Sequence, residues 1–307
     1  MSKKIILSLL IVLLSLFQPQ LRTAHAERLE NEQIVIEYEK SLQSVAEHIV
    51  RIYPALKADL EARYRAALNV RPTIQIIKKR EAFQKIIGAD PVVAVAIAKS
   101  NLIIIDNSKM KTHPFSLETT LKHELCHLFL HHYINGREMP RWLNEGICQS
   151  VSDGVAEILI GYNENLLSQA VLSNSLLPFK GLEKQFPSNE RSLLLAYEQS
   201  SSLVKYIENE FGMDSVVQIL QSLKKGKDID EAVFHTLSVS VHELETHWIK
   251  HLKKRIIWAT YISIHIYQIL FACAGLLLVY GFVRLTIRRR AYKDEEDSES
   301  PDTNDDS

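Results

Sequence analysis

The sequence predicts an α+β fold in which a small sheet precedes a mostly helical C-terminal half, with an apolar segment at each end of the chain. Short β-branched runs lie between residues 73 and 105, whereas apolar residues at helical spacing dominate after residue 116. The 307 residues permit one or two domains with a sizeable core. A net charge of −1 gives no electrostatic reason to expect a nucleic-acid partner.

Residues 1–26 have the composition of a secretory signal peptide. Lys3 and Lys4 precede an apolar run over residues 5–17, and Ala24-His25-Ala26 offers an A-x-A cleavage site. We therefore expect Glu27 to be the mature N-terminus and the following residues to be exported. An uncleaved N-terminal anchor is the alternative.

Residues 27–72 are predicted to form a separate N-terminal helical segment. Its apolar residues recur at helical spacing, as at Leu42, Val45 and Ile49, and Pro72 ends the pattern. A propeptide role for residues 27–70 stays open.

The predicted sheet follows directly. Residues 73–77 are a β-branched run, and residues 80–87 are predicted to form a short helix closed by Gly88. Two apolar runs, 92–98 and 102–105, are separated by three polar residues. They are typical of a hairpin or an adjacent strand pair.

A metal-binding pattern lies in the next predicted helix, which Ser116 can cap and Asn135-Gly136 ends. It reads His123-Glu124-Leu125-Cys126-His127. Histidines four apart on a helix differ in direction by only about 40°, so both imidazoles can hold one ion. Glu124 lies beside them, where it can act as a base on water. This is the H-E-x-x-H signature of zinc hydrolases, chiefly metalloproteases.

A third ligand is needed, because catalytic zinc takes three protein ligands and leaves one position open. His131 shares the helix face but lies a turn too far away. Glu145 is the better candidate, since it follows His127 by 18 residues on a second predicted helix that begins near Pro140.

The segment Pro140-Arg141-Trp142-Leu143-Asn144-Glu145-Gly146 resembles the second zinc motif of gluzincins, above all the aminopeptidase-N-like enzymes. Residues 70–250, with the Ala196–Ser201 segment, are similar to small gluzincin-like domains of the peptidase MA superfamily. The resemblance implies a zincin-like metallopeptidase domain over residues 73–253. It implies Zn²⁺ held by His123, His127 and Glu145, with a water on zinc activated by Glu124 to hydrolyse peptide bonds.

At some positions this sequence differs from the residues that these families use, and at Tyr197 the role stays open. Aminopeptidases of this group carry an amine-binding glutamate in a strand that corresponds to residues 92–98, which contain none. We therefore expect an endopeptidase. Gln149 stands where thermolysin-like relatives orient a histidine with aspartate, and it can do so only as a neutral partner. Tyr197 is expected to stabilise the tetrahedral oxyanion, with a packing role as the alternative.

Cys126 and Cys148 flank the predicted ligands, and Cys273 lies near the C-terminal end. An oxidising compartment would permit a Cys126–Cys148 disulfide. We favour the alternative that both are small buried residues without a bond.

Residues 256–283 contain no Asp, Glu, Lys or Arg and are predicted to form one transmembrane helix, with a buried core helix as the alternative. Residues 284–307 are predicted to be a basic stop followed by an acidic, disordered cytoplasmic tail. The signal peptide places the catalytic domain outside the cytosol, so the sequence predicts a single-pass protein of the cell membrane. Its expected partner is a protein or peptide substrate.

Two other functions stay open at this stage. The domain would be a catalytically silent, zinc-stabilised binding module if Glu124 had no reaction to catalyse. It would be an aminopeptidase if another residue bound the free amine of the substrate. The sequence makes no prediction of oligomeric state.

Overall fold

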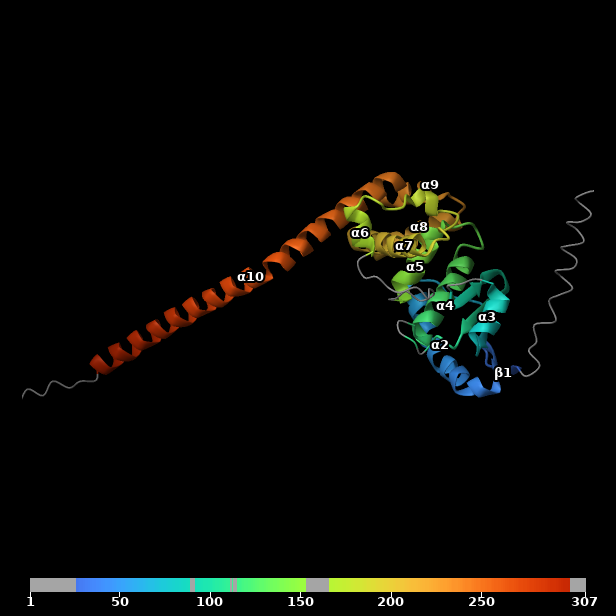
Figure 1. The fold of residues 1–307 in the computed structure, drawn as a ribbon, viewed down its shortest axis with the longest axis horizontal. Helices are drawn as coiled ribbons and strands as arrows, with labels where there is room; N and C mark the ends of the chain where they lie inside the picture. The colour runs from blue at the N-terminus through green and yellow to red at the C-terminus, as the bar shows by residue number, and fades with distance from the viewer. Residues whose placement is uncertain (1–25, 89–91, 111, 113–114, 153–165, 299–307) are drawn as a thin grey trace, which may run out of the picture. The chain divides into compact units, whose positions relative to one another are not determined.

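The computed structural model describes residues 26–88, 92–110, 112, 115–152 and 166–298. The chain divides into two units, Met1–Ile249 and Lys250–Ser307. The first unit combines a small sheet with packed helices, which confirms the predicted α+β class (Figure 1). The predicted signal peptide lies outside the described residues, apart from Ala26.

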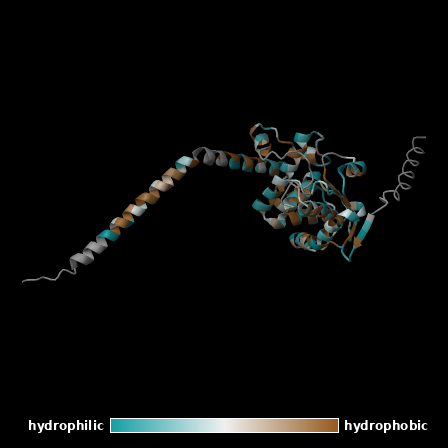
Figure 2. Cartoon of the chain, turned by 60° about the horizontal axis from the view of Figure 1, so that its bottom comes forward, coloured by the Kyte–Doolittle hydropathy of each residue, from teal (hydrophilic) through white to brown (hydrophobic). Residues whose placement is uncertain are grey.

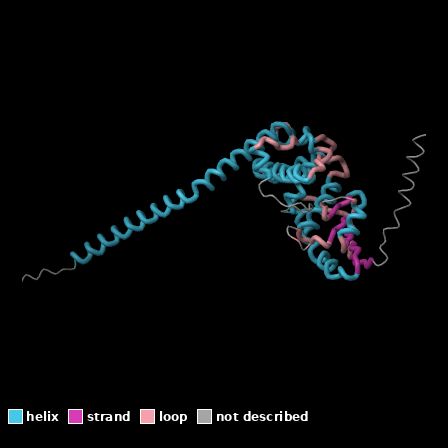
Figure 3. The backbone as a smooth tube through the Cα atoms, in the orientation of Figure 1, coloured by secondary structure: helices cyan, strands magenta, loops and turns pink. Residues whose placement is uncertain are grey.

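Five strands form one mixed sheet in the order β1-β2-β3-β5-β4, and Figure 3 shows them gathered in one part of the unit. β2 pairs in parallel with β3, and β3 with β5, whereas the β1–β2 and β5–β4 pairs are antiparallel. β4 is therefore an edge strand. The bounds are β1 (Ala26–Glu30), β2 (Val35–Glu39), β3 (Thr73–Ile77), β4 (Ala94–Ile97) and β5 (Leu102–Asp106).

The prediction of a separate helical segment over residues 27–72 is wrong. The helical spacing does form a helix, α2 (Gln43–Tyr64), but β1 and β2 precede it. The missed signal is alternation, because Ile34, Ile36 and Tyr38 are buried at every second position. Since β2 pairs with β3, residue 72 is no structural boundary, and removing residues 27–70 would take away two strands of the sheet.

The predictions for residues 73–106 are confirmed. α3 (Arg80–Ile87) ends at Gly88, whose φ of 69° is the left-handed conformation common after a helix. Ile103, Ile104 and Ile105 of β5 are all buried, and alternate residues point to opposite faces, so β5 is covered on both faces. Phe83 of α3 packs with Ile104, and α4 (Leu117–Tyr133) contacts β4 and β5.

Helices make up the rest of the first unit. As predicted, the Ser116 side chain caps α4 by accepting a hydrogen bond from the Thr119 N–H, and the later helices break at Gly212 and Gly226. Short 3-10 turns lie at Lys40–Leu42, Ala98–Ser100 and Phe179–Leu182. The helices that follow α4 are α5 (Arg141–Ser152), α6 (Leu166–Leu172), α7 (Glu190–Phe211), α8 (Met213–Lys224), α9 (Ile229–Leu237) and α10 (Val241–Ser298).

α5 lies between α4 and α7 and contacts both. At Gly146 the backbone of α5 approaches α7 so closely that a Cβ atom would overlap the carbonyl oxygen of Ser200. The same Cβ would lie 2.8 Å from Val204 Cγ2. Only glycine allows this approach, which holds α5 against the rest of the domain.

The second unit consists mainly of α10, in which Ile266–Arg289 is long and apolar enough to cross a membrane. Figure 2 shows the apolar residues along it. This stretch shares residues 266–283 with the predicted span of residues 256–283. The prediction of a disordered acidic tail is wrong for residues 294–298, which continue α10. Residues 288–293 are rich in Arg, Ala and Lys, and residues 295 and 296 are Glu; these strong helix formers carry the helix into the acidic residues.

We predict that Gly146→Ala lowers the free energy of unfolding by roughly 1–3 kcal/mol, because the new methyl group must displace backbone atoms of α7. Chemical denaturation of the full chain in detergent measures the change. Gly181→Ala is the matched control, since its added Cβ would meet only Pro178 Cγ at 3.9 Å. Equal stability of the two variants would contradict the close approach.

Candidate metal centre

α4 brings the two histidines of the H-E-x-x-H pattern together. Ser116 caps the helix, and Glu118 in its first turn complements the helix dipole, so the segment is helical through the motif. The imidazoles of His123 and His127 point the same way, with their Nε2 atoms 3.1 Å apart. His123 is fully buried, and His127 lines a cavity.

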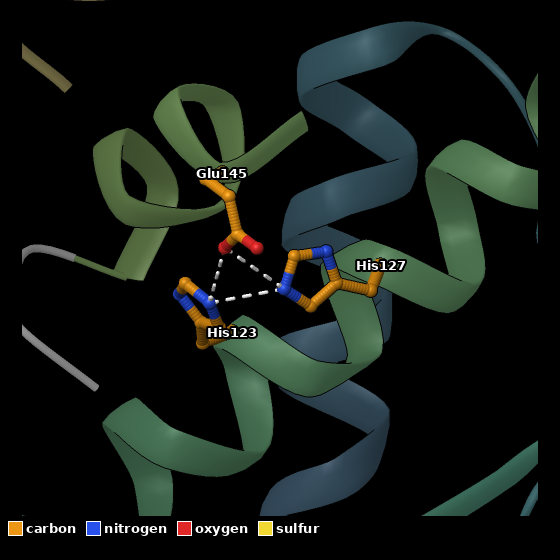
Figure 4. Close-up of side chains that lie close together, drawn as sticks. All are labelled: His123, His127 and Glu145. Atoms are coloured by element: carbon orange, nitrogen blue, oxygen red, sulfur yellow. Dashed lines mark hydrogen bonds and ion pairs between the residues drawn. The ribbon is translucent and has the colours of Figure 1, made fainter. Parts of the chain in front are cut away.

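α5 adds the carboxylate. Glu145 points toward both histidines, and its Oε2 lies 3.7 Å from His123 Nε2 and 3.5 Å from His127 Nε2 (Figure 4). The chain reverses direction between α4 and α5, because later residues of α5 contact earlier residues of α4: Asn144 lies at His127 and Ser152 at His123. The structure therefore brings together the three residues that the sequence predicts as metal ligands.

The spacing of these three atoms fits a tetrahedral metal site. With metal–ligand distances near 2.0–2.1 Å, neighbouring ligand atoms of a tetrahedral zinc site lie about 3.4 Å apart. The observed separations are 3.1, 3.5 and 3.7 Å. Glu145 Oε2 is buried and accepts no hydrogen bond from the described residues. A cation between the three atoms would supply the partner that this buried oxygen needs.

Two further side chains of α5 contact the opposite ring nitrogens. Asn144 Oδ1 lies 2.6 Å from His127 Nδ1, and Ser152 Oγ lies 3.4 Å from His123 Nδ1. Because the Asn144 oxygen only accepts hydrogen bonds, His127 carries its proton on Nδ1 and keeps a lone pair on Nε2. Ser152 Oγ donates to the Cys148 carbonyl at 2.8 Å, which leaves it free to accept from His123.

The sequence offered Gln149 as a neutral partner that could orient a histidine, and the structure places Ser152 against His123 Nδ1. On a helix, residues four apart share a face, so Ser152 continues the line of Asn144 and Cys148 that faces α4. Gln149 instead follows Glu145 on the adjacent line. The spacing of 144, 148 and 152 was the signal that could have identified Ser152.

Two of the ligands, His127 and Glu145, line a cavity of about 410 Å³. Glu124 lines it beside His127 and Glu145, as does the edge strand β4 through Ala94, Val95 and Ala96. Glu124 is itself fully buried, so its carboxylate is removed from bulk water next to the ligand set. Room for a substrate thus lies next to a base and a candidate metal site.

Tyr197 of α7 lines the same cavity. Tyr197 is only 3% exposed, and its ring packs edge-on against the ring of Phe186, with the ring centres 5.0 Å apart. Burial raises the pKa of the neighbouring Glu198 carboxyl group. The Leu167 N–H donates a hydrogen bond to this carboxylate at 3.0 Å, which lowers the pKa and so offsets part of the effect of burial.

Arg141 contacts the second oxygen of Glu145. Its Nε lies 3.5 Å from Oε1, and its guanidinium lies 4.9 Å from the centre of the Phe186 ring. The Arg141 side chain is 42% exposed, so this ion pair contributes little to stability. Its position does favour an orientation in which Oε1 faces Arg141 and Oε2 faces the histidines.

Cys126 and Cys148 form a disulfide, so the expectation of two unbonded small residues is wrong. Their Cα atoms are 5.4 Å apart, within the range that a disulfide spans. The pairing depends on how closely α4 packs against α5, a distance that residue spacing along the chain does not give.

The fold and the site define a class of protein: a domain of the metallopeptidase type, in which an H-E-x-x-H helix meets a glutamate from the next helix. The family model of the peptidase MA superfamily matches residues 59–254. The chain belongs to this superfamily, whose members are typically metal-dependent. No individual curated protein matches the chain at a significant level. The matched region begins within α2, in the segment that the sequence had suggested was separate.

We predict that Asn144→Ala weakens zinc binding by about 10–100-fold, because His127 loses the acceptor that fixes its orientation and tautomer. Competition with a chromogenic chelator measures the affinity. Gln149→Ala is the control on the same helix and should bind zinc as the parent chain does. The opposite ranking of the two variants would return the orienting role to Gln149.

Proposed function

We propose that the chain is a membrane-anchored zinc metalloprotease that hydrolyses peptide bonds within a protein or peptide substrate. The observation that carries the proposal is Glu124, a buried carboxylate lining the same cavity as His127 and Glu145. A purely structural metal site has no use for a base beside an open cavity.

His123, His127 and Glu145 would hold the zinc ion. Bound there, zinc lowers the pKa of water toward neutrality and polarises a carbonyl group. Glu124 takes the proton from the attacking water and passes it to the leaving amine. Tyr197 donates its hydroxyl hydrogen to the oxyanion that develops on the former carbonyl oxygen.

The composition of the cavity wall supports endopeptidase action. Among the described residues, the wall contributed by β4 and its flanks consists of Val92, Ala94, Val95, Ala96 and Ala98, without a carboxylate to bind a free amine. Glu183 is the observation in favour of an aminopeptidase, because it also lines the cavity. Lys184 beside it offers the opposite charge.

The proposed anchor is the apolar part of α10, Ile266–Arg289. Residues 1–26 would direct export, so the peptidase domain would lie on the extracytoplasmic side with the C-terminus in the cytoplasm. Protease protection of a C-terminal tag in sealed cells tests this orientation.

We predict that Glu124→Gln retains zinc but lowers the rate of peptide hydrolysis by at least about 10²–10⁴-fold, because the amide cannot accept the proton. His123→Ala should lose zinc and activity together. Zinc content is measured by elemental analysis and hydrolysis with a quenched fluorescent peptide, both on the full chain in detergent.

Two substrates extend this experiment. An endopeptidase cleaves N-acetylated and free-amine forms of one internal sequence at similar rates, whereas an aminopeptidase acting through Glu183 requires the free amine. Full activity in Glu124→Gln would refute the mechanism. A zinc-bound parent chain without hydrolysis of any peptide would favour the silent binding module.

We predict that Tyr197→Phe lowers kcat by about 10–10³-fold with little change in KM or zinc content, because the hydroxyl acts on the oxyanion and not on the bound substrate. Tyr206→Phe, on the same helix but outside the cavity lining, is the control. An unchanged kcat in Tyr197→Phe would assign the residue to packing alone.

A further inference from the structure

One side of α5 carries a line of three residues that all face the histidines of α4. Asn144, Cys148 and Ser152 follow one another at intervals of four, so they lie one above the other on the helix. Asn144 and Ser152 contact the Nδ1 atoms of His127 and His123. Cys148 lies between them, with its Sγ 3.4 Å from His127 Nδ1.

The middle position of this line is covalently fixed. Cys148 bonds to Cys126, the residue directly before His127, and both cysteines are fully buried. The bond closes a segment with a sequence separation of 22, and this segment contains His127 and Glu145. Two of the three ligands therefore lie inside a closed covalent loop.

The turn that joins α4 to α5 constrains the relative position of the two helices less than the disulfide does. Residues 135–138 of the turn are exposed, and Asn135 and Gly136 both have positive φ angles, of 56° and 68°. A tight, solvent-exposed turn fixes the chain direction but not how far α5 slides or rotates along α4. The disulfide fixes both, at the level where Asn144 and Glu145 must meet His127.

We propose that the Cys126–Cys148 disulfide positions the metal ligands: it sets the register of α5 on α4 and so holds Glu145 within reach of the His123–His127 pair. This role rests on the proposed zinc site. It differs from general stabilisation, because the bond touches a ligand ring and lies between the two residues that orient the histidines. Breaking it should weaken zinc binding while the domain stays folded.

The test compares full-length chains in detergent, all carrying Cys273→Ser so that the pair contains the only cysteines. The variant Cys126→Ala/Cys148→Ala is compared with the Cys273→Ser parent. Zinc affinity is measured by chelator competition well below the thermal midpoint of both proteins, and circular dichroism monitors the fold. We expect about 10–100-fold weaker zinc binding in the double variant, the size of loss seen when ligand-orienting groups are removed.

A second arm breaks the bond without removing atoms from the core. A water-soluble trialkylphosphine is oxidised to its phosphine oxide by taking an oxygen atom from water, and the two sulfurs each gain a hydrogen. Dithiols are avoided because they chelate zinc. Thiol titration confirms complete reduction, after which zinc affinity should fall as in the double variant and return on reoxidation. This arm also decides the question if the double variant does not fold.

The outcomes separate the two proposals. Zinc affinity within about twofold of the parent, with only a lower thermal midpoint, would overturn the positioning role and leave the metalloprotease intact. Zinc affinity that depends on the disulfide in a chain without peptidase activity would support the positioning role and refute the proposed function. A parent chain that binds no zinc would overturn both.

Discussion

The packing of α5 between α4 and α7 is the constraint on which the candidate site depends. His123 and His127 come from α4, whereas Glu145, Asn144 and Ser152 come from α5, so the site exists only where the two helices meet. α7 packs against the other side of α5, and the two helices can come this close only because Gly146 has no side chain. The glycine that follows Glu145 therefore serves the ligand set indirectly, by letting the helix behind it come close.

This packing brings three ligand atoms close together at a cost in free energy that a bound cation would offset. A buried carboxylate and two imidazole nitrogens face one another at 3.1–3.7 Å, and burial of an unsatisfied acceptor costs roughly 1–3 kcal/mol. The surrounding contacts do not remove this cost. Asn144 and Ser152 contact the outer nitrogens of the two histidines, and Arg141 contacts the outer oxygen of Glu145, so the inner atoms of all three ligands point toward one spot.

The parts that the sequence predicts correctly depend on local rules. Histidines four apart share a helix face wherever the helix lies, and Gly88 ends α3 because of its own backbone conformation. The errors concern distances between elements or very short patterns. The strand β2 was missed because its alternation covers only Ile34 to Tyr38. The disulfide was considered but not favoured, because the gap between α4 and α5 is set by side-chain packing.

The position of β4 links the sheet to the proposed choice of substrate. It pairs only with β5 among the described strands, so its other edge faces away from the sheet, and its small residues Ala94 and Ala96 line the cavity. An extended peptide can add to such an edge through main-chain hydrogen bonds, which recognise backbone along its whole length rather than a chain end. A site that binds substrate in this way has no need of a free amine. The lack of a carboxylate among the described residues of this wall and the edge position of β4 thus support the same proposal, cleavage within a chain.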